Sequence, residues 1–206
     1  RGALSHPPSA GWLRCTWLLL CCFGRPRPAA CRRLRCSSHS GKYVPVRSLG
    51  IATSMVPTLV LDDGSSLYDS PVICEYLDRQ HTGPIMIPSD GAGRWRVLRE
   101  QALADGILDC AVLIFVEFGK RPEDKRWDWW VELKQRAITR ALDRLEQQTA
   151  QLRERVDLGT ICIAVALGYL DLRGAVGEWR ESRPALAAWY AEFAKRPSMI
   201  ATAPPG

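Results

Sequence analysis

The sequence predicts an α+β protein in which a small mixed unit precedes a larger, all-helical domain. Two observations predict this class: a strand–turn–strand–helix pattern spans residues 56–77, and helical patterns dominate from residue 90 onward. In the first 55 residues, no period of 2 or 3.6 is sustained. We therefore expect three regions: an atypical basic segment at 1–54, the small mixed unit at 55–82 and the helical domain at 88–206.

The small unit begins as a hairpin. Val56–Leu61 is a run of β-branched residues and leucine, and Ser65–Tyr68 can return as a second short strand. Asp63-Gly64 between them favours a two-residue primed turn, because glycine accepts a positive φ without a Cβ clash. Pro57 removes a backbone donor at the start of the first strand, a position usual for an edge strand, a bulge or a cis peptide bond.

A capped helix is predicted directly after the hairpin. Asp69 or Ser70 can cap it, and Pro71 suits its first position, where the missing N–H costs nothing. The N-terminus of a helix offers unpaired N–H groups and a partial positive charge, which favour a bound carboxylate. An ordinary hairpin followed by a capped helix, with no ligand, is the alternative interpretation.

In order and spacing, these motifs resemble the second half of the thioredoxin-like domain of glutathione S-transferases, and the tail ATAPP resembles that of bacterial members. In that family a cis Val-Pro peptide binds the cysteinyl part of glutathione, and an acidic residue followed by Ser holds the γ-glutamyl end. The resemblance implies glutathione-binding roles for Val56, Pro57, Asp69 and Ser70. It also implies a thioredoxin-like N-terminal domain followed by an all-α glutathione S-transferase C-terminal domain.

The first βαβ unit of such a domain is degraded or missing in the sequence as written. Residues 1–55 contain eight Arg, one Lys and no Asp or Glu, which leaves 19 of the 28 basic and all 22 acidic side chains to the rest of the chain. Five of the eight cysteines also precede residue 40. We hypothesise that 1–54 is an out-of-frame or mispredicted replacement, consistent with a chain that begins with Arg. A genuine basic arm for phosphates or anionic lipid is the alternative.

A long helix is predicted from about residue 90 to Phe118. From Leu103 to Val116 it is apolar nearly all round, which indicates a buried central helix. Asp105 and Asp109 are four residues apart and therefore share a face. They could project into a ligand cleft or across a dimer interface, or they could pair with Arg side chains at a helix edge.

A second helix is predicted from about Glu123 to Arg155, with an apolar stripe along one side. Near its beginning, Trp127, Trp129 and Trp130 could line a hydrophobic acceptor pocket or pack the helix pair.

Thr160–Leu170 is hydrophobic on every side and too short to span a membrane, so we expect a core helix. The family's Thr/Ser-x-x-Asp capping box would place Thr160 at the cap, with Ile163 in the position of the Asp, so the reciprocal bond is expected to be missing. Pro184 opens a last helix that Arg196-Pro197 is expected to end.

By resemblance, the protein is expected to use the glutathione thiolate against a hydrophobic electrophile, as a glutathione transferase. The catalytic hydrogen-bond donor would lie within 1–54, where no residue can be nominated, so activity is expected to be impaired if that segment is as written. A non-catalytic relative with the same fold, used for interaction or regulation, is the alternative. The cysteines and the three His show no paired metal-ligand spacing, so we expect no metal.

The family also implies a cytoplasmic homodimer whose small-molecule partners are glutathione and the electrophile. We expect neither nucleic acid nor membrane as a partner, because the positive charge is confined to one segment and the rest of the chain is mildly acidic.

Overall fold

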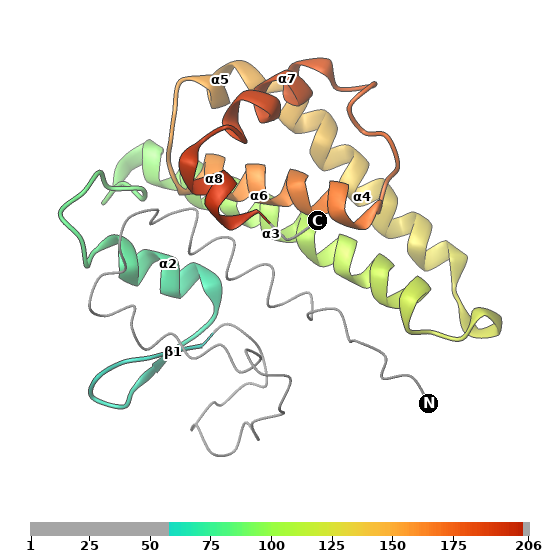
Figure 1. Ribbon diagram of the computed structural model, residues 1–206, viewed down its shortest axis with the longest axis horizontal. Helices are drawn as coiled ribbons and strands as arrows, with labels where there is room; N and C mark the ends of the chain where they lie inside the picture. The colour runs from blue at the N-terminus through green and yellow to red at the C-terminus, as the bar shows by residue number, and fades with distance from the viewer. Residues whose placement is uncertain (1–57, 204–206) are drawn as a thin grey trace. The chain divides into compact units, whose positions relative to one another are not determined.

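The computed structural model describes residues 58–203, which form two compact units. The first comprises the described residues up to Pro84 together with 201–203, and the second is Ile85–Ile200. In the described part of the first unit, Figure 1 shows a hairpin followed by one helix, whereas the regular elements of the second unit are all helices. Val56, Pro57 and the 1–54 segment lie outside the described residues.

The hairpin consists of β1 (Leu59–Val60) and β2 (Ser66–Leu67), paired antiparallel. Leu59 lies opposite Leu67, and Val60 lies opposite Ser66. Leu59 is fully buried, so the strand anchors one apolar side chain in the core of the unit.

The turn between the strands differs from the predicted one. The register leaves three residues, 62–64, in the loop, and Leu61 N–H donates to the Ser65 carbonyl oxygen at 2.9 Å. Gly64 has a φ of 85°, which is the left-handed residue expected at the end of a three-residue loop. The two-residue turn predicted for Asp63-Gly64 is therefore wrong. Asp63 Oδ1 instead accepts hydrogen bonds from the N–H and the hydroxyl of Ser65, at 2.9 and 2.6 Å.

Helix α2 (Ser70–Asp78) follows the hairpin, and Pro71 lies in its first turn, as the second residue of the helix where the first was predicted. Its inner face buries Ile73, Cys74 and Leu77, which are spaced for one side of a helix. After the helix, His81 Nε2 lies 3.4 Å from Oδ1 of the buried Asp78.

The helical unit is built on three long helices: α3 (Gly91–Gly119), α4 (Asp128–Gln147) and α6 (Leu158–Arg173). Helix α3 packs mainly against α6 and α4. Figure 1 shows the shorter α5 (Thr149–Arg153) and α7 (Pro184–Phe193) beside them. A 3₁₀ turn, η3 (Glu123–Lys125), lies between α3 and α4, and α8 (Pro197–Thr202) comes last.

Helix α6 is the predicted core helix, and residues 158–170 are all buried. Its cap is not where the sequence placed it, because the helix begins at Leu158. Asp157 is the N-cap and Thr160 is N3: Asp157 Oδ1 accepts from Thr160 N–H, and Thr160 Oγ1 accepts from Asp157 N–H, both at 3.0 Å. The reciprocal capping box is therefore present, with its acidic and hydroxyl residues in reversed order, and Ile163 is an ordinary core side chain.

Helix α3 is buried on one side only, which corrects the expectation of an apolar helix enclosed all round. Its buried face holds small and aliphatic side chains at helical spacing, together with three polar ones: Val97, Ala104, Ile107, Leu108, Ala111 and Ile114, with Glu100, Gln101 and Glu117. The opposite side is exposed along its length, with Leu113 40% and Val116 43% exposed. Residues 103–116 are apolar on both sides although only one side is covered in this chain.

The predicted helix from Glu123 to Arg155 is divided into η3, α4 and α5. The Thr149 hydroxyl donates to the carbonyl oxygens of Leu145 and Glu146, at 2.9 and 3.0 Å, where α4 gives way to α5. Such side-chain bonds to the preceding turn bend helices. Similarly, Pro197 begins α8, whereas α7 has already ended at Phe193.

Candidate functional site

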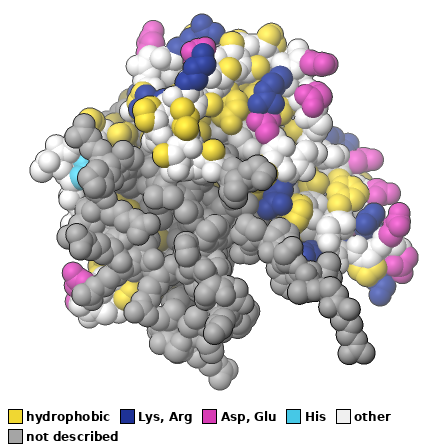
Figure 2. Space-filling view, viewed as in Figure 1, with side chains coloured by type: hydrophobic (Ala, Val, Ile, Leu, Met, Phe, Trp, Pro, Cys, Tyr) yellow, Lys and Arg dark blue, Asp and Glu magenta, His cyan; other side chains and the backbone are white. Residues whose placement is uncertain are grey.

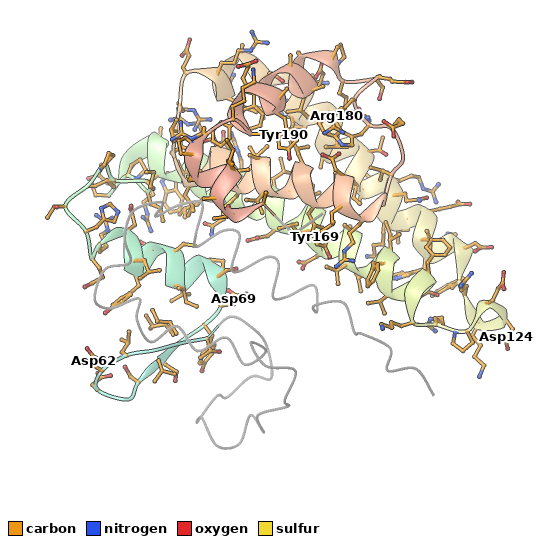
Figure 3. The ribbon with its side chains drawn as sticks, viewed as in Figure 1. Asp62, Asp69, Asp124, Tyr169, Arg180 and Tyr190 are labelled. Carbon is orange, nitrogen blue, oxygen red and sulfur yellow. The ribbon has the colours of Figure 1, made fainter. Side chains whose placement is uncertain are left out.

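The N-terminus of α2 is the candidate binding site within the described residues. Asp69 is the N-cap, in an extended conformation with φ of −96° and ψ of −151°, and its side chain is exposed. Its carboxylate makes no capping hydrogen bond, although an Asp at this position usually does. Figure 3 shows Asp69 at the start of α2, where the chain enters the helix from the hairpin. The carboxylate is therefore available to a partner outside the helix.

The first turn of α2 presents donors that the helix itself does not use. Ser70 is the first helical residue and is buried. The first hydrogen bond of the helix runs from Ile73 N–H to the Asp69 carbonyl oxygen, at 3.1 Å. Backbone N–H groups in the first turn have no carbonyl partner within the helix. No acidic residue lies in this first turn, so the N-cap Asp69 is the acidic residue next in sequence to the positive end of the helix dipole. The arrangement offers an anion site with an acidic side chain beside it.

The predicted site residues are distributed over three regions. Asp69 and Ser70 are adjacent at the tip of α2, whereas Val56 and Pro57 lie outside the described residues, so the cis Val-Pro peptide stays a prediction. Asp105 and Asp109 belong to the helical unit, on α3. Asp105 is half-buried and Asp109 is exposed.

Sequence reasoning missed a charged cluster in the helical unit. The buried Glu100 accepts a hydrogen bond from Arg155 Nη2 at 2.8 Å, and Arg155 Nη1 donates to Asp157 Oδ2 at 2.6 Å. Desolvation, the largest single influence, acts to lower the pKa of Arg155, but the hydrogen bonds and charges of Glu100 and Asp157 together raise it. The cluster joins α3 to the cap of α6. No spacing pattern could have revealed it, because Glu100 and Arg155 are 55 residues apart.

A second ionic cluster lies between α6 and α7. Arg180 donates to both carboxylate oxygens of Asp171, at 2.7 and 2.6 Å, and its guanidinium stacks 4.6 Å from the centre of the Trp179 ring. These hydrogen bonds raise the pKa of Arg180. Figure 3 shows Arg180 and Tyr190 close together, and the guanidinium lies 5.7 Å from the centre of that ring. The contacts hold the segment that follows α6 in place and present no reactive group.

The tryptophans at the start of α4 pack largely on one another. The Trp127 ring lies 5.1 Å from that of Trp129 and 6.2 Å from that of Trp130, centre to centre. Trp127 is 58% and Trp129 53% exposed, so these two rings present apolar surface to solvent. The Lys134 ammonium lies 3.9 Å above the centre of the Trp130 ring.

Charge on the helical unit is mixed in sign. On the face in Figure 2, Lys and Arg side chains alternate with Asp and Glu around hydrophobic patches. Residues 58–203 hold no group of three or more His, Cys, Asp or Glu side chains that could bind a metal ion. Among the helices described, none combines the length and the apolar character that crossing a membrane requires.

Comparison with known proteins assigns the family. A model of the glutathione S-transferase N-terminal domain matches residues 11–80, and a model of the C-terminal domain matches residues 130–192. The uncharacterized GST-like protein YibF of Escherichia coli K12 is 36% identical over 153 residues, which cover 73% of this chain and 75% of YibF. The chain belongs to the glutathione S-transferase family.

Solved structures of this family are similar to the chain in both sequence and fold. A glutathione transferase family member from Pseudomonas fluorescens Pf-5, crystallised with S-(propanoic acid)-glutathione, is 44% identical, with a TM-score of 0.80 and 98% of both chains covered. A glutathione S-transferase from Methylobacillus flagellatus KT, with glutathione bound, is 39% identical over 73% of this chain and 76% of that one, with a TM-score of 0.68. The predicted fold class, α+β with a thioredoxin-like N-terminal domain followed by an all-α C-terminal domain, is confirmed. The N-terminal match begins at residue 11, inside the segment that the sequence had marked as atypical.

Proposed function

We propose that this glutathione S-transferase binds glutathione at the N-terminus of α2. The proposal rests on the N-cap residue Asp69, whose side chain makes no capping hydrogen bond. Its exposed carboxylate can accept hydrogen bonds from the γ-glutamyl ammonium group. The γ-glutamyl carboxylate would then meet the free N–H groups of the first turn and the Ser70 hydroxyl. Val56 and Pro57 would bind the cysteinyl part through their backbone. Relatives crystallised with glutathione or its conjugates support this assignment.

The reaction we propose is addition of the glutathione sulfur to a hydrophobic electrophile. The thiolate attacks an electrophilic carbon, a carbon–sulfur bond forms, and the leaving group departs with its electron pair or, in an addition, the neighbouring carbon takes a proton. One hydrogen-bond donor in the first unit would lower the thiol pKa by stabilising the thiolate. We place that donor in the 1–54 region and expect weak turnover if the region is as written. The protein would act as a cytoplasmic homodimer.

Isothermal titration of the full chain with glutathione tests the binding site. Asp69→Asn removes the charge with little change in shape, and we expect the dissociation constant to rise at least about tenfold, since a hydrogen bond to a charged group contributes about 1.5–3 kcal/mol. Asp124→Asn, the same change at an exposed position of η3, is the control and should leave binding unchanged. A wild-type chain that does not bind glutathione, or an Asp69→Asn variant that binds as well as wild type, would contradict the proposal.

Turnover separates the enzyme from the non-catalytic alternative. Conjugation of glutathione to 1-chloro-2,4-dinitrobenzene can be followed by absorbance on the same samples. Glutathione binding without conjugation of this or other aromatic and alkyl electrophiles would favour an interaction or regulatory protein.

Translation of the upstream DNA in its other two frames tests the origin of 1–54. We expect a strand followed by a loop with Ser, Tyr or Cys next to Pro, and its absence from both frames would remove the frame hypothesis.

A further inference from the structure

Arg173, the last residue of α6, has no carboxylate partner among the described residues. Three other arginines of the helical unit each lie within 2.8 Å of a carboxylate oxygen: Arg155 beside Glu100 and Asp157, Arg180 beside Asp171, and Arg183 beside Asp143. Residues 1–57 and 204–206 contain no Asp or Glu, so the rest of the chain supplies no acidic side chain to Arg173 either. Its charge is therefore left for a partner outside the chain.

Two aromatic side chains hold the guanidinium of Arg173 in place. Its Nε donates a hydrogen bond to the hydroxyl of Tyr169, at 3.2 Å, and Tyr169 is only 1% exposed. The central carbon, Cζ, lies 4.1 Å above the centre of the Phe115 ring and 5.3 Å from the centre of the Tyr169 ring. Figure 3 shows Tyr169 on α6. Because Phe115 belongs to α3, the contacts fix the guanidinium between two helices.

These contacts leave most of the donors of Arg173 unused. Nη1 and Nη2 together carry four N–H groups, and within residues 58–203 none of them has an acceptor. The Tyr169 hydroxyl accepts from Nε, and its own hydrogen has no acceptor in the same part of the chain. A planar pair of N–H donors matches the two oxygens of a carboxylate. Arg173 is half-buried, and solvent ions screen such a site less than a fully exposed one.

The position of Arg173 in α6 does not by itself require an arginine. A cation in the last turn of a helix interacts favourably with the helix dipole, and a lysine would supply that charge equally well. The planar guanidinium stacked on Phe115 is what a lysine could not reproduce. Asp171, two residues earlier, is bound through both of its oxygens to Arg180, so it does not take the place of a ligand.

The surroundings of the free donors favour an acid that carries one charge and an apolar body. Arg173 supplies a single positive charge, which balances one carboxylate, whereas a phosphate dianion would leave a charge unbalanced. Leu172, its neighbour in sequence, is 44% exposed, and the Phe115 ring is half-buried. Apolar side chains thus accompany the guanidinium both in sequence and in space.

We propose that Arg173 binds the carboxylate of a small apolar organic acid through Nη1 and Nη2. The apolar part of the acid lies against Phe115 and Leu172. This site goes beyond the proposed glutathione site, because all of its residues belong to the helical unit and none belongs to α2. Its ligand class is a monocarboxylate with an aromatic or aliphatic body.

Titration of the isotopically labelled full chain with phenylacetate tests the site by NMR. The Nε–H signal of Arg173, assigned from its absence in Arg173→Lys, should shift in a saturable way with a dissociation constant of about 1 mM or below. Phenylacetamide has nearly the same shape without the charge, and it should bind at least about tenfold more weakly. Inorganic phosphate should also bind at least about tenfold more weakly.

Two variants separate the planar donors from the charge. Arg173→Lys keeps the charge but removes the planar pair of donors, so the affinity for phenylacetate should fall at least about fivefold. Tyr169→Phe removes the acceptor that orients Nε and should weaken binding about two- to threefold. The backbone N–H signals of Leu172 and Gly174 report binding in both variants. Arg140→Lys, at an exposed position of α4, is the matched control and should bind as wild type does.

Each result supports or overturns a stated part of the proposal. An Arg173→Lys variant that binds phenylacetate as well as wild type, or phenylacetamide bound as tightly as phenylacetate, would overturn the role of the guanidinium. Phosphate bound more tightly than phenylacetate would overturn the ligand class. A wild-type chain with no saturable shift up to about 20 mM would overturn the site itself. Titration of the same samples with glutathione reports the α2 site separately, so either proposal can fail while the other stands.

Discussion

The first unit, which contains the hairpin and is called the hairpin unit below, differs from the helical unit in the contacts that its carboxylates make. In the helical unit, the buried Glu100 is bonded to Arg155, and Glu146 accepts from the N–H groups of Ala185 and Leu186 at 3.1 and 2.7 Å. Carboxylates there join one helix to another. In the hairpin unit, Asp69 at the tip of α2 makes no capping bond. The carboxylates that join one helix to another are thus in the helical unit, whereas the exposed Asp69 carboxylate, which is available to a ligand, is in the other unit.

This contrast indicates which substitutions should change stability and which should change ligand binding. A buried charge that loses its partner is costly, because neither water nor another residue replaces the lost interaction. An exposed carboxylate at a helix tip can be changed with little effect on stability, because water solvates it in the free protein. We therefore expect changes in the helical unit to affect unfolding, and changes at the α2 tip to affect ligand binding.

Removal of the arginine between α3 and α6 should have the largest effect. Arg155→Ala leaves the buried Glu100 and the capping residue Asp157 without their cation, so we expect the free energy of unfolding to fall by about 3 kcal/mol. Urea unfolding followed by circular dichroism measures it. Arg153→Ala, at an exposed position of α5, is the control and should cost less than about 0.5 kcal/mol. A loss below about 1 kcal/mol for Arg155→Ala would mean that the cluster does not stabilise the helical unit.

Two glycines of the helical unit should respond to alanine with opposite signs. At Gly159, a Cβ would lie within 3 Å of the Glu100 side chain, so Gly159→Ala forces the α3–α6 contact apart and should destabilise by about 1–3 kcal/mol. At Gly106 the space is open, and Gly106→Ala should stabilise the monomer by about 0.5–1 kcal/mol. Thermal unfolding of both variants at low protein concentration makes the comparison. Equal effects would show that close approach between α3 and α6 does not explain Gly159.

The smallest expected effect is a change in the pKa of Asp63 in the hairpin turn. The hydroxyl and N–H of Ser65 lower the pKa of Asp63 below its ordinary 3.8. Because the folded value is the lower one, the stabilising contribution is present above the ordinary pKa and is lost as the pH falls through the folded pKa. An NMR titration should find the pKa of Asp63 closer to 3.8 in Ser65→Ala, whereas Ser66→Ala should leave it low. A pKa that Ser65→Ala leaves unchanged would contradict the assigned hydrogen bonds.

Local signals predicted much of the fold. Pro71 and Pro184 both lie in the first turns of helices, and the uniformly apolar stretch after Asp157 is the buried helix α6. The sequence also placed Asp69 and Ser70 together at a helix N-terminus, and they are adjacent there. These predictions succeeded because each depends on neighbours within about one turn of helix or one strand pair.

The errors share a different cause. The three-residue turn depends on the Asp63–Ser65 bonds and on the strand register, and the order of the α6 capping box depends on where the helix meets the chain before it. For α3, composition could not distinguish a helix covered on all sides from one whose outer side is exposed in this chain. In each case several structures were compatible with the local sequence pattern. Contacts with residues outside that pattern determined which of them formed.

The amino-acid sequence alone determined the family, the order of the elements and the acidic helix tip at Asp69, because turn chemistry, proline and apolar periodicity act over short distances. Tertiary structure alone decided that Arg155 joins Glu100 to the cap of α6, that Gly159 lies against Glu100, and that one side of α3 stays exposed. Those outcomes require residues far apart in the chain to meet, and their meeting depends on how whole helices pack.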